Sequence, residues 1–184
     1  MSLAESYASV ARMLDYPAGK EGMLADHGTV DRVLREKGIE SPLAPFVRFV
    51  ETSALAGLQE EYVATFDFNP AVALYLGHHL FGDNREKGAY LIRLKQEFGR
   101  HGFIPSGNEL PDHLPLLLGF LAYLARSGED GVRRSFISEC VLPGVERLGA
   151  AFSARWDSPW RPVVEAARLL CAADSAIPEE GKPC

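Results

Sequence analysis

Apolar residues recur with a period of about 3.6 along the whole 184-residue chain, whereas strict alternation of apolar and polar residues is hard to find. Such a period is typical of amphipathic helices that each bury one stripe of side chains. We therefore expect an all-α fold, a single-domain bundle of eight or nine helices. Residues 1–174 would form the domain, and residues 175–184 would be a flexible, solvated tail.

Capping and helix-breaking residues divide this periodic pattern into segments. Thr29 is a candidate N-cap, Gly57 a candidate bend, and Asn69 followed by Pro70 a favourable helix start. The expected helices are a first segment that ends at Tyr16, then 30–38, 42–66 as one bent helix or two consecutive helices, 71–80, 85–101, about 112–125, 129–141, 143–155 and 159–173.

The segment at about 112–125 is apolar on every side, so we expect it at the centre of the bundle with neighbours all around it. Asp112 would cap its first turn and favour the positive end of the helix. The segment is interrupted by Pro115 and Gly119 and is too short to span a bilayer, which takes roughly 20 apolar residues.

Charge and cysteine usage narrow the possible partners and the compartment. The formal charge of −6 disfavours nucleic acid and anionic membrane surfaces and favours a basic partner. The three cysteines form no C-x-x-C pair, and one would stay unpaired in any disulfide scheme. The first residues have no basic region followed by an apolar one. We therefore expect a cytoplasmic protein that neither binds nucleic acid nor inserts into membranes.

Catalytic signatures such as a phosphate-binding glycine loop or H-E-x-x-H do not occur in the sequence. Two polar clusters interrupt the apolar pattern instead, at 74–88 and at 109–115. His78 and His79 point about 100° apart on a helix, so they cannot both face one metal ion, and ordinary packing explains them better. The second cluster can be a helix cap and loop, or the lining of a groove.

Three stretches in this order resemble the NarJ branch of the TorD/DmsD-like redox-enzyme maturation proteins, which are assembly chaperones for respiratory nitrate reductase. They are Ala11–Pro17 (ARMLDYP), Glu61–Asp67 (EYVATFD) running on to His79 and to Gly82–Gly88 (GDNREKG), and Glu109–Pro115 (ELPDHLP). The last stretch is similar to the acidic, Pro and Asp-His signature of the family.

The resemblance implies an all-α protein that is not an enzyme and carries no cofactor of its own. It would bind the N-terminal segment of the apo catalytic subunit of a nitrate reductase or related molybdoenzyme. It would hold that subunit open while the molybdenum cofactor is inserted and delay membrane docking until then. Whether it is a monomer or a dimer stays open.

A groove for the apolar face of a helix, lined by acids that complement basic residues, would suit this role. The candidate peptide-binding residues are Tyr62, Phe66, Asp67, Tyr75, His78, His79, Phe81, Asp83, Arg85, Glu109, Pro111, Asp112 and His113. Any one of the aromatic residues could equally be plain core.

Two other functions compete with this one. A helical metal-dependent phosphohydrolase could draw ligands from several helices, although the sequence offers no spaced ligand pair. Its candidate ligands are His27, His78, His79, Asp83, Asp112 and His113. A nonspecific helical scaffold would show no peptide preference.

Overall fold

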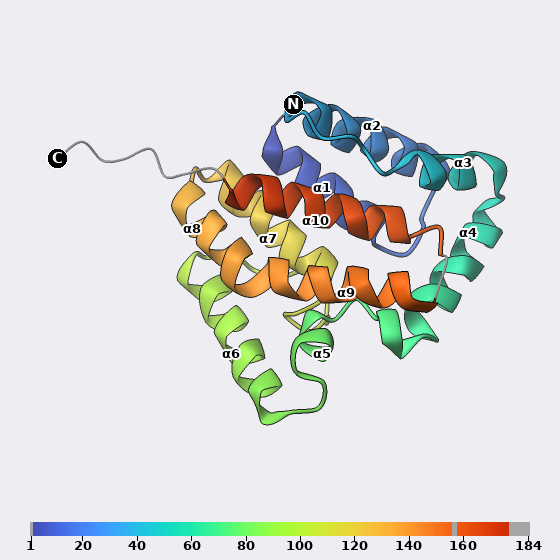
Figure 1. Ribbon diagram of the computed structural model, residues 1–184. Helices are drawn as coiled ribbons and strands as arrows, with labels where there is room; N and C mark the ends of the chain where they lie inside the picture. The colour runs from blue at the N-terminus through green and yellow to red at the C-terminus, as the bar shows by residue number, and fades with distance from the viewer. Residues whose placement is uncertain (1, 156–157, 177–184) are drawn as a thin grey trace.

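The computed structural model describes residues 2–155 and 158–176, which fold into helices joined by short connections (Figure 1). The α-helices are α1 (Leu3–Met13), α2 (Lys20–Glu36), α3 (Ala44–Thr52), α4 (Leu55–Tyr62), α5 (Leu76–Phe81), α6 (Arg85–Arg100), α7 (Leu114–Arg126), α8 (Asp130–Phe136), α9 (Leu142–Arg155) and α10 (Arg161–Ser175). A π-helical turn, Val63–Asp67, extends α4, and another, Ile137–Val141, joins α8 to α9. A short 3-10 turn covers Pro70–Val72.

Because the second π turn makes α8 and α9 one continuous helix, the described ranges hold nine helices and no strand beyond one isolated bridge. The predicted all-α bundle is confirmed. No helix in these ranges is long and apolar enough to cross a membrane. The expected tail lies outside the described residues from 177 on, and α10 runs to Ser175.

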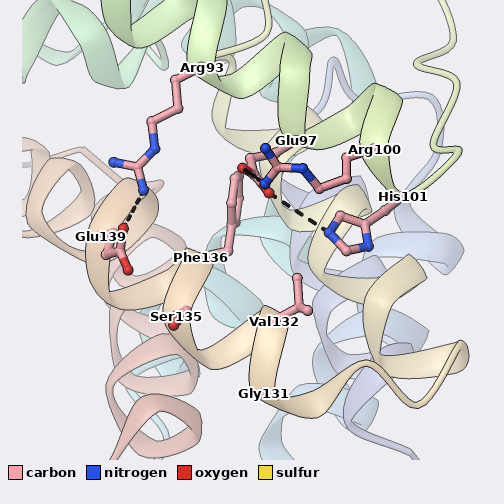
Figure 2. Close-up of a pocket in the computed structure, with 9 residues that line it drawn as sticks. All are labelled: Arg93, Glu97, Arg100, His101, Gly131, Val132, Ser135, Phe136 and Glu139. Carbon is pink, nitrogen blue, oxygen red and sulfur yellow. Dashed lines mark hydrogen bonds and ion pairs between the residues drawn. The ribbon is translucent and has the colours of Figure 1, made fainter.

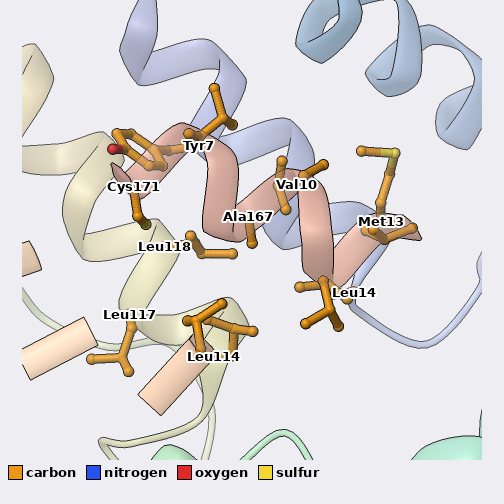
Figure 3. Close-up of a cluster of buried hydrophobic side chains, with 14 of the residues drawn as sticks. Tyr7, Val10, Met13, Leu14, Leu114, Leu117, Leu118, Ala167 and Cys171 are labelled. Atoms are coloured by element: carbon orange, nitrogen blue, oxygen red, sulfur yellow. The ribbon is translucent and has the colours of Figure 1, made fainter. Parts of the chain in front are cut away.

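Helix α7 lies at the centre, as predicted, with α1, α8 and α10 around it (Figure 1). Every third or fourth position and several between them are buried, which fits a helix with neighbours on all sides. Figure 3 shows the middle of this core, where α7 meets α1 and α10 through Tyr7, Val10, Met13, Leu14, Leu114, Leu117, Leu118, Ala167 and Cys171.

A buried ion pair ties α8 to α10 and to α1. The Arg133 guanidinium donates to the Asp174 carboxylate from Nε at 2.7 Å and from Nη2 at 3.0 Å. The Tyr7 hydroxyl donates to the same carboxylate at 2.9 Å. Arg133 also pairs with Asp130 at the surface. Three helices that are far apart in the sequence therefore share one fully hydrogen-bonded carboxylate.

An aromatic cluster around the buried Trp160 ties α3 and α4 to the start of α10. Its indole nitrogen donates to the Met13 carbonyl at 3.0 Å, and its ring meets four others edge-on. These are the rings of Phe46, Phe49, Tyr62 and Phe66, with centroids 5.6–6.3 Å away. Edge-to-face contacts of this kind add to the energy of apolar burial.

Helix α2 begins earlier than the sequence predicts. It starts at Lys20, so Thr29 lies in its interior and does not cap its first turn. Two glycines lower the helix propensity of residues 20–28. Tertiary contacts compensate, because Met23 is buried in the core and Asp26 accepts a hydrogen bond at 3.0 Å from Arg12 of α1.

Residues 42–66 form two consecutive helices, one of the two expected alternatives, but the break lies at Ser53 and Ala54 and not at Gly57. The Lys20 ammonium donates to the carbonyl of Glu51 at 3.0 Å and to that of Ser53 at 2.8 Å. These bonds satisfy carbonyls that the end of α3 leaves free. The helix end is therefore fixed by a residue from another helix.

Asn69 caps a shorter element than expected. Its side chain accepts from the Ala71 N–H at 3.3 Å, as a cap should, but the turn ends at Val72. The predicted helix over 71–80 is therefore only partly present, and α5 begins at Leu76. Residues 73–75 are not helical because they pair with the loop that precedes α7.

Candidate functional site

The two polar clusters of the sequence meet in space. The Leu114 N–H donates to the Leu74 carbonyl at 2.8 Å, and the Leu76 N–H donates to the Asp112 carbonyl at 3.0 Å. These bonds form an antiparallel bridge between Tyr75 and His113, whose ring centroids lie 5.2 Å apart. The start of α5 and the loop before α7 are thus held together as one unit.

The buried Asp112 side chain holds the two parts of this unit together through a hydrogen bond. It is fully buried, and its Oδ2 accepts from the Gly77 N–H at 2.9 Å. It therefore satisfies the first turn of α5 and makes no cap bond to α7, which corrects the predicted role. A Cβ on Gly77 would stand 2.8 Å from the same oxygen, so only glycine fits there. Among the described residues, no donor reaches Asp112 Oδ1.

Burial raises the pKa of Asp112, although its backbone hydrogen bonds oppose the shift. A folded-state pKa above the unfolded one means that the folded protein holds the proton more tightly, so stability falls as pH rises through this window. Asp112→Asn cannot titrate at this position. We expect the stability of wild type relative to Asp112→Asn to decline between pH 3.8 and the raised pKa.

Urea unfolding of both proteins at a series of pH values measures this difference. Asp31→Asn, a surface carboxylate paired with Arg35, is the control for a general effect of removing a carboxylate. A difference between wild type and Asp112→Asn that stays constant with pH would contradict the assignment.

Three carboxylates gather on the surface above this unit, and we call them the acidic patch: Asp15, Asp67 and Glu109. Burial raises the pKa of the Tyr62 hydroxyl, and the charges of all three carboxylates add to this shift, so each of them lies within electrostatic reach of that hydroxyl. Glu109 accepts from the Tyr75 hydroxyl at 2.6 Å; burial and this bond raise the pKa of Tyr75 to about 12. Within the described residues, no cation forms an ion pair with any of the three.

A hollow of about 400 Å³, here the α1–α7 hollow, opens beside the acidic patch. Asp15 and Glu109 belong to its lining, together with His113, whose pKa is lowered by burial while the nearby carboxylates oppose the shift. The rest of the lining is mixed: it includes apolar side chains, among them Ile104, which is 88% exposed, and also two arginines. The other lining residues are Ala11, Arg12, Phe103, Ser106, Pro115, Leu116, Gly119 and Arg126.

Tyr62 and Phe66, two of the predicted peptide-binding residues, lie in the core. The Tyr62 hydroxyl donates to the Leu14 carbonyl at 3.0 Å, and both rings pack against Trp160. Through the Leu14 bond, Tyr62 fixes the end of α1 and with it Asp15. These two core residues therefore fix the backbone next to two acids of the patch: Tyr62 next to Asp15 and Phe66 next to Asp67.

The other predicted residues lie outside the lining of the α1–α7 hollow. His79 is half-buried; its Nε2 is 2.7 Å from the Ala73 carbonyl, and burial lowers its pKa. Arg147 donates to the His79 and Leu80 carbonyls and so ends α5. The remaining predicted residues are His78, which meets His79 edge-on, Phe81, packed on Tyr90, the exposed Asp83 and Arg85, and the buried Pro111.

Asp15, Phe103 and Ile104 contribute to the site but are not among the predicted residues. Asp15 stands in the ARMLDYP stretch that carries the family resemblance, and this was the available signal. Phe103 and Ile104 sit in a loop with no periodic pattern, so nothing in the sequence distinguishes them.

A second hollow, of about 510 Å³, lies between α6 and α8 (Figure 2). Its charges are internally paired: Arg93 with Glu139 across the hollow, and Arg100 with Glu97 at 2.6 Å. A charged ligand would have to compete with these pairs. The acidic patch has no such competition, which makes it the better candidate site.

The described part of the chain holds no group of three or more His, Cys, Asp or Glu side chains that could bind a metal ion. The candidate ligands of the phosphohydrolase alternative are not assembled into a site. Nothing in the geometry favours that alternative.

Comparison with known proteins identifies the family. The sequence model of the nitrate reductase delta subunit family matches residues 35–165, which is most of the chain. The chain belongs to this family. The match contains two of the three stretches that carry the resemblance, Glu61–Gly88 and Glu109–Pro115, and thereby the bridged unit of α5 and the loop before α7.

Several relatives are named as assembly chaperones. The chain is 34% identical over 120 residues to the probable nitrate reductase molybdenum cofactor assembly chaperone NarJ of Bacillus subtilis, over 64% of each chain. It is 32% identical over 124 residues to NarJ of Escherichia coli K12, over 64% of this chain and 51% of that one. It thus spans only half to two thirds of these relatives. The selenate reductase assembly chaperone protein of Thauera selenatis is 28% identical over 98% of this chain and 82% of its own length.

Proposed function

We propose that this protein is a system-specific assembly chaperone for a respiratory nitrate reductase or a related molybdoenzyme. It binds the N-terminal segment of the apo catalytic subunit in the cytoplasm and assists insertion of the molybdenum cofactor before the enzyme docks on the membrane. Family membership supports this role, as do relatives whose names describe assembly chaperones and not catalysts. The protein itself is not an enzyme.

One observation carries the proposal for the binding site. Each of the three stretches that carry the family resemblance contributes one carboxylate to the acidic patch, namely Asp15, Asp67 and Glu109. Folding brings them together from the end of α1, a π turn and a loop. All three are exposed, and none of them forms an ion pair among the described residues, so they are free to pair with a cationic ligand.

The patch and the α1–α7 hollow together suit a basic amphipathic segment. Carboxylates at the rim attract a basic peptide, speed its association and fix its register. Apolar lining beside them takes the apolar face of a peptide helix. The net charge of −6 adds a weaker, less local attraction for a basic peptide.

The triple variant Asp15→Asn, Asp67→Asn and Glu109→Gln tests the site. We expect its affinity for the N-terminal peptide of the cognate catalytic subunit to fall about tenfold at low salt, because each rim charge contributes up to about 1 kcal/mol. The loss should shrink as salt screens the wild-type attraction. Titration calorimetry with the synthetic peptide at several salt concentrations measures both effects.

A matched control neutralises three exposed carboxylates elsewhere: Glu36 at the end of α2, Glu40 after it, and Glu129 between α7 and α8. It changes the net charge equally and should leave affinity within about twofold. Equal losses in both triple variants would show that only net charge matters. A wild-type protein that does not bind the peptide would overturn the proposed function.

A further inference from the structure

Two exposed aromatic side chains face a further hollow next to the acidic patch. Phe68 is 80% exposed and Tyr16 is 51% exposed, and both line a hollow of about 380 Å³. The rest of its lining comes from α4 and the π turn: Ala56, Gln59, Glu60, Val63 and Ala64. Single exposed apolar residues are ordinary, but two that share one mostly apolar depression indicate a surface that another molecule covers.

Both aromatic residues are held in place by their neighbours. The Tyr16 ring stands edge-on to Tyr62 at 5.8 Å, and the Gln59 amide donates to the Pro17 carbonyl at 2.9 Å. The Phe68 N–H donates to the Val63 carbonyl at 3.1 Å, which ends the π turn. Because the backbone is fixed at both positions, a ligand that binds between the two rings causes a smaller loss of conformational entropy.

The Tyr16–Phe68 hollow adjoins the acidic patch, because each of its two aromatic residues directly follows an acid of the patch in the sequence. Tyr16 directly follows Asp15, and Phe68 directly follows Asp67. One acid–aromatic pair therefore follows α1 and the other stands at the end of the π turn; Tyr16 contacts Tyr62 edge-on, and both acids lie within electrostatic reach of its hydroxyl. A ligand whose positive charge pairs with these acids therefore lies next to the hollow.

We propose that the Tyr16–Phe68 hollow binds a bulky apolar side chain of the same client segment whose basic residue contacts the acidic patch. This inference rests on the proposed function and adds a requirement on the client. Residues three or four apart lie on one face of a helix. The client segment should thus carry Leu, Ile, Met or Phe three or four positions from a Lys or Arg.

Phe68→Ser tests the inference, and its exposure means that the fold does not depend on the ring. We expect the affinity for the synthetic N-terminal peptide to fall about tenfold or more, because the ring loses its buried contact. Unlike the loss from the acidic-patch variant, this loss should not change with salt, since apolar contact is not screened. Ile92→Ser, which removes another exposed apolar side chain, 59% exposed on α6, is the matched control.

A second arm replaces the apolar residue of the peptide by Ala. If that residue occupies the hollow, the replacement weakens binding to wild type but adds little to Phe68→Ser, and the double-mutant cycle shows coupling. Equal affinity of Phe68→Ser and wild type would overturn the inference while leaving the proposed function intact. So would a wild-type dimer in sedimentation that Phe68→Ser dissociates without weakening peptide binding. No peptide binding by wild type would overturn the proposed function itself.

Discussion

Asp174→Ala is expected to lower the free energy of unfolding by about 3–5 kcal/mol. The Asp174 side chain is fully buried, and it accepts two hydrogen bonds from Arg133 and one from Tyr7. Removing it leaves the guanidinium of Arg133, itself only 3% exposed, without its buried counter-charge. A buried ion that loses its partner costs far more than the pair contributed.

The same arginine provides the control. Asp130 also pairs with Arg133, but its side chain is 57% exposed, so Asp130→Ala should cost less than about 1 kcal/mol. Urea unfolding followed by circular dichroism gives both values. Similar losses for the two variants would show that burial does not set the energy of this network.

Trp160→Ala is expected to cost about 3–5 kcal/mol, the usual range for removing a fully buried large aromatic side chain. The indole fills the space between α3, α4 and the start of α10, and four aromatic rings lose their common neighbour when it is removed. Tyr62 is one of them, and it holds the end of α1 through Leu14. Peptide affinity should therefore fall together with stability.

Trp160→Phe separates packing from hydrogen bonding. It keeps an aromatic ring in the cluster but leaves the Met13 carbonyl without its indole donor, and we expect a loss of about 1–3 kcal/mol. Thermal and urea unfolding of the two variants provide the comparison. If Trp160→Ala were no more costly than Trp160→Phe, the aromatic cluster would not be the source of stability.

The helices could be predicted because burial on one face leaves a periodic trace in the sequence. α7 was identifiable as central because it has no polar face, and α6 was found within a residue of its bounds. The predicted helix ends were wrong where a residue distant in the sequence determines the boundary. Lys20 ends α3, and the bridge to His113 delays the start of α5.

The site could be predicted only in part, for the same reason. Glu109, His113 and Tyr75 stood out as members of the two polar clusters, and the structure brings them into contact. Their role in binding a peptide stays a prediction. Asp112 was misassigned because a local capping rule considers only the helix that follows, whereas its partner Gly77 lies 35 residues away. An aromatic residue on a helix face, such as Phe66, cannot be assigned to core or groove until its distant neighbours are known.

The bond between Tyr7 and Asp174 joins positions 167 residues apart, and this separation sets the order of events during synthesis. α1 and α7 can meet as soon as the ribosome has released α7, but their shared surface stays uncovered until α10 follows. Nascent chains expose such apolar surface and are prone to aggregate while they wait. A protein proposed to shield an unfinished enzyme thus keeps part of its own core uncovered until α10 leaves the ribosome.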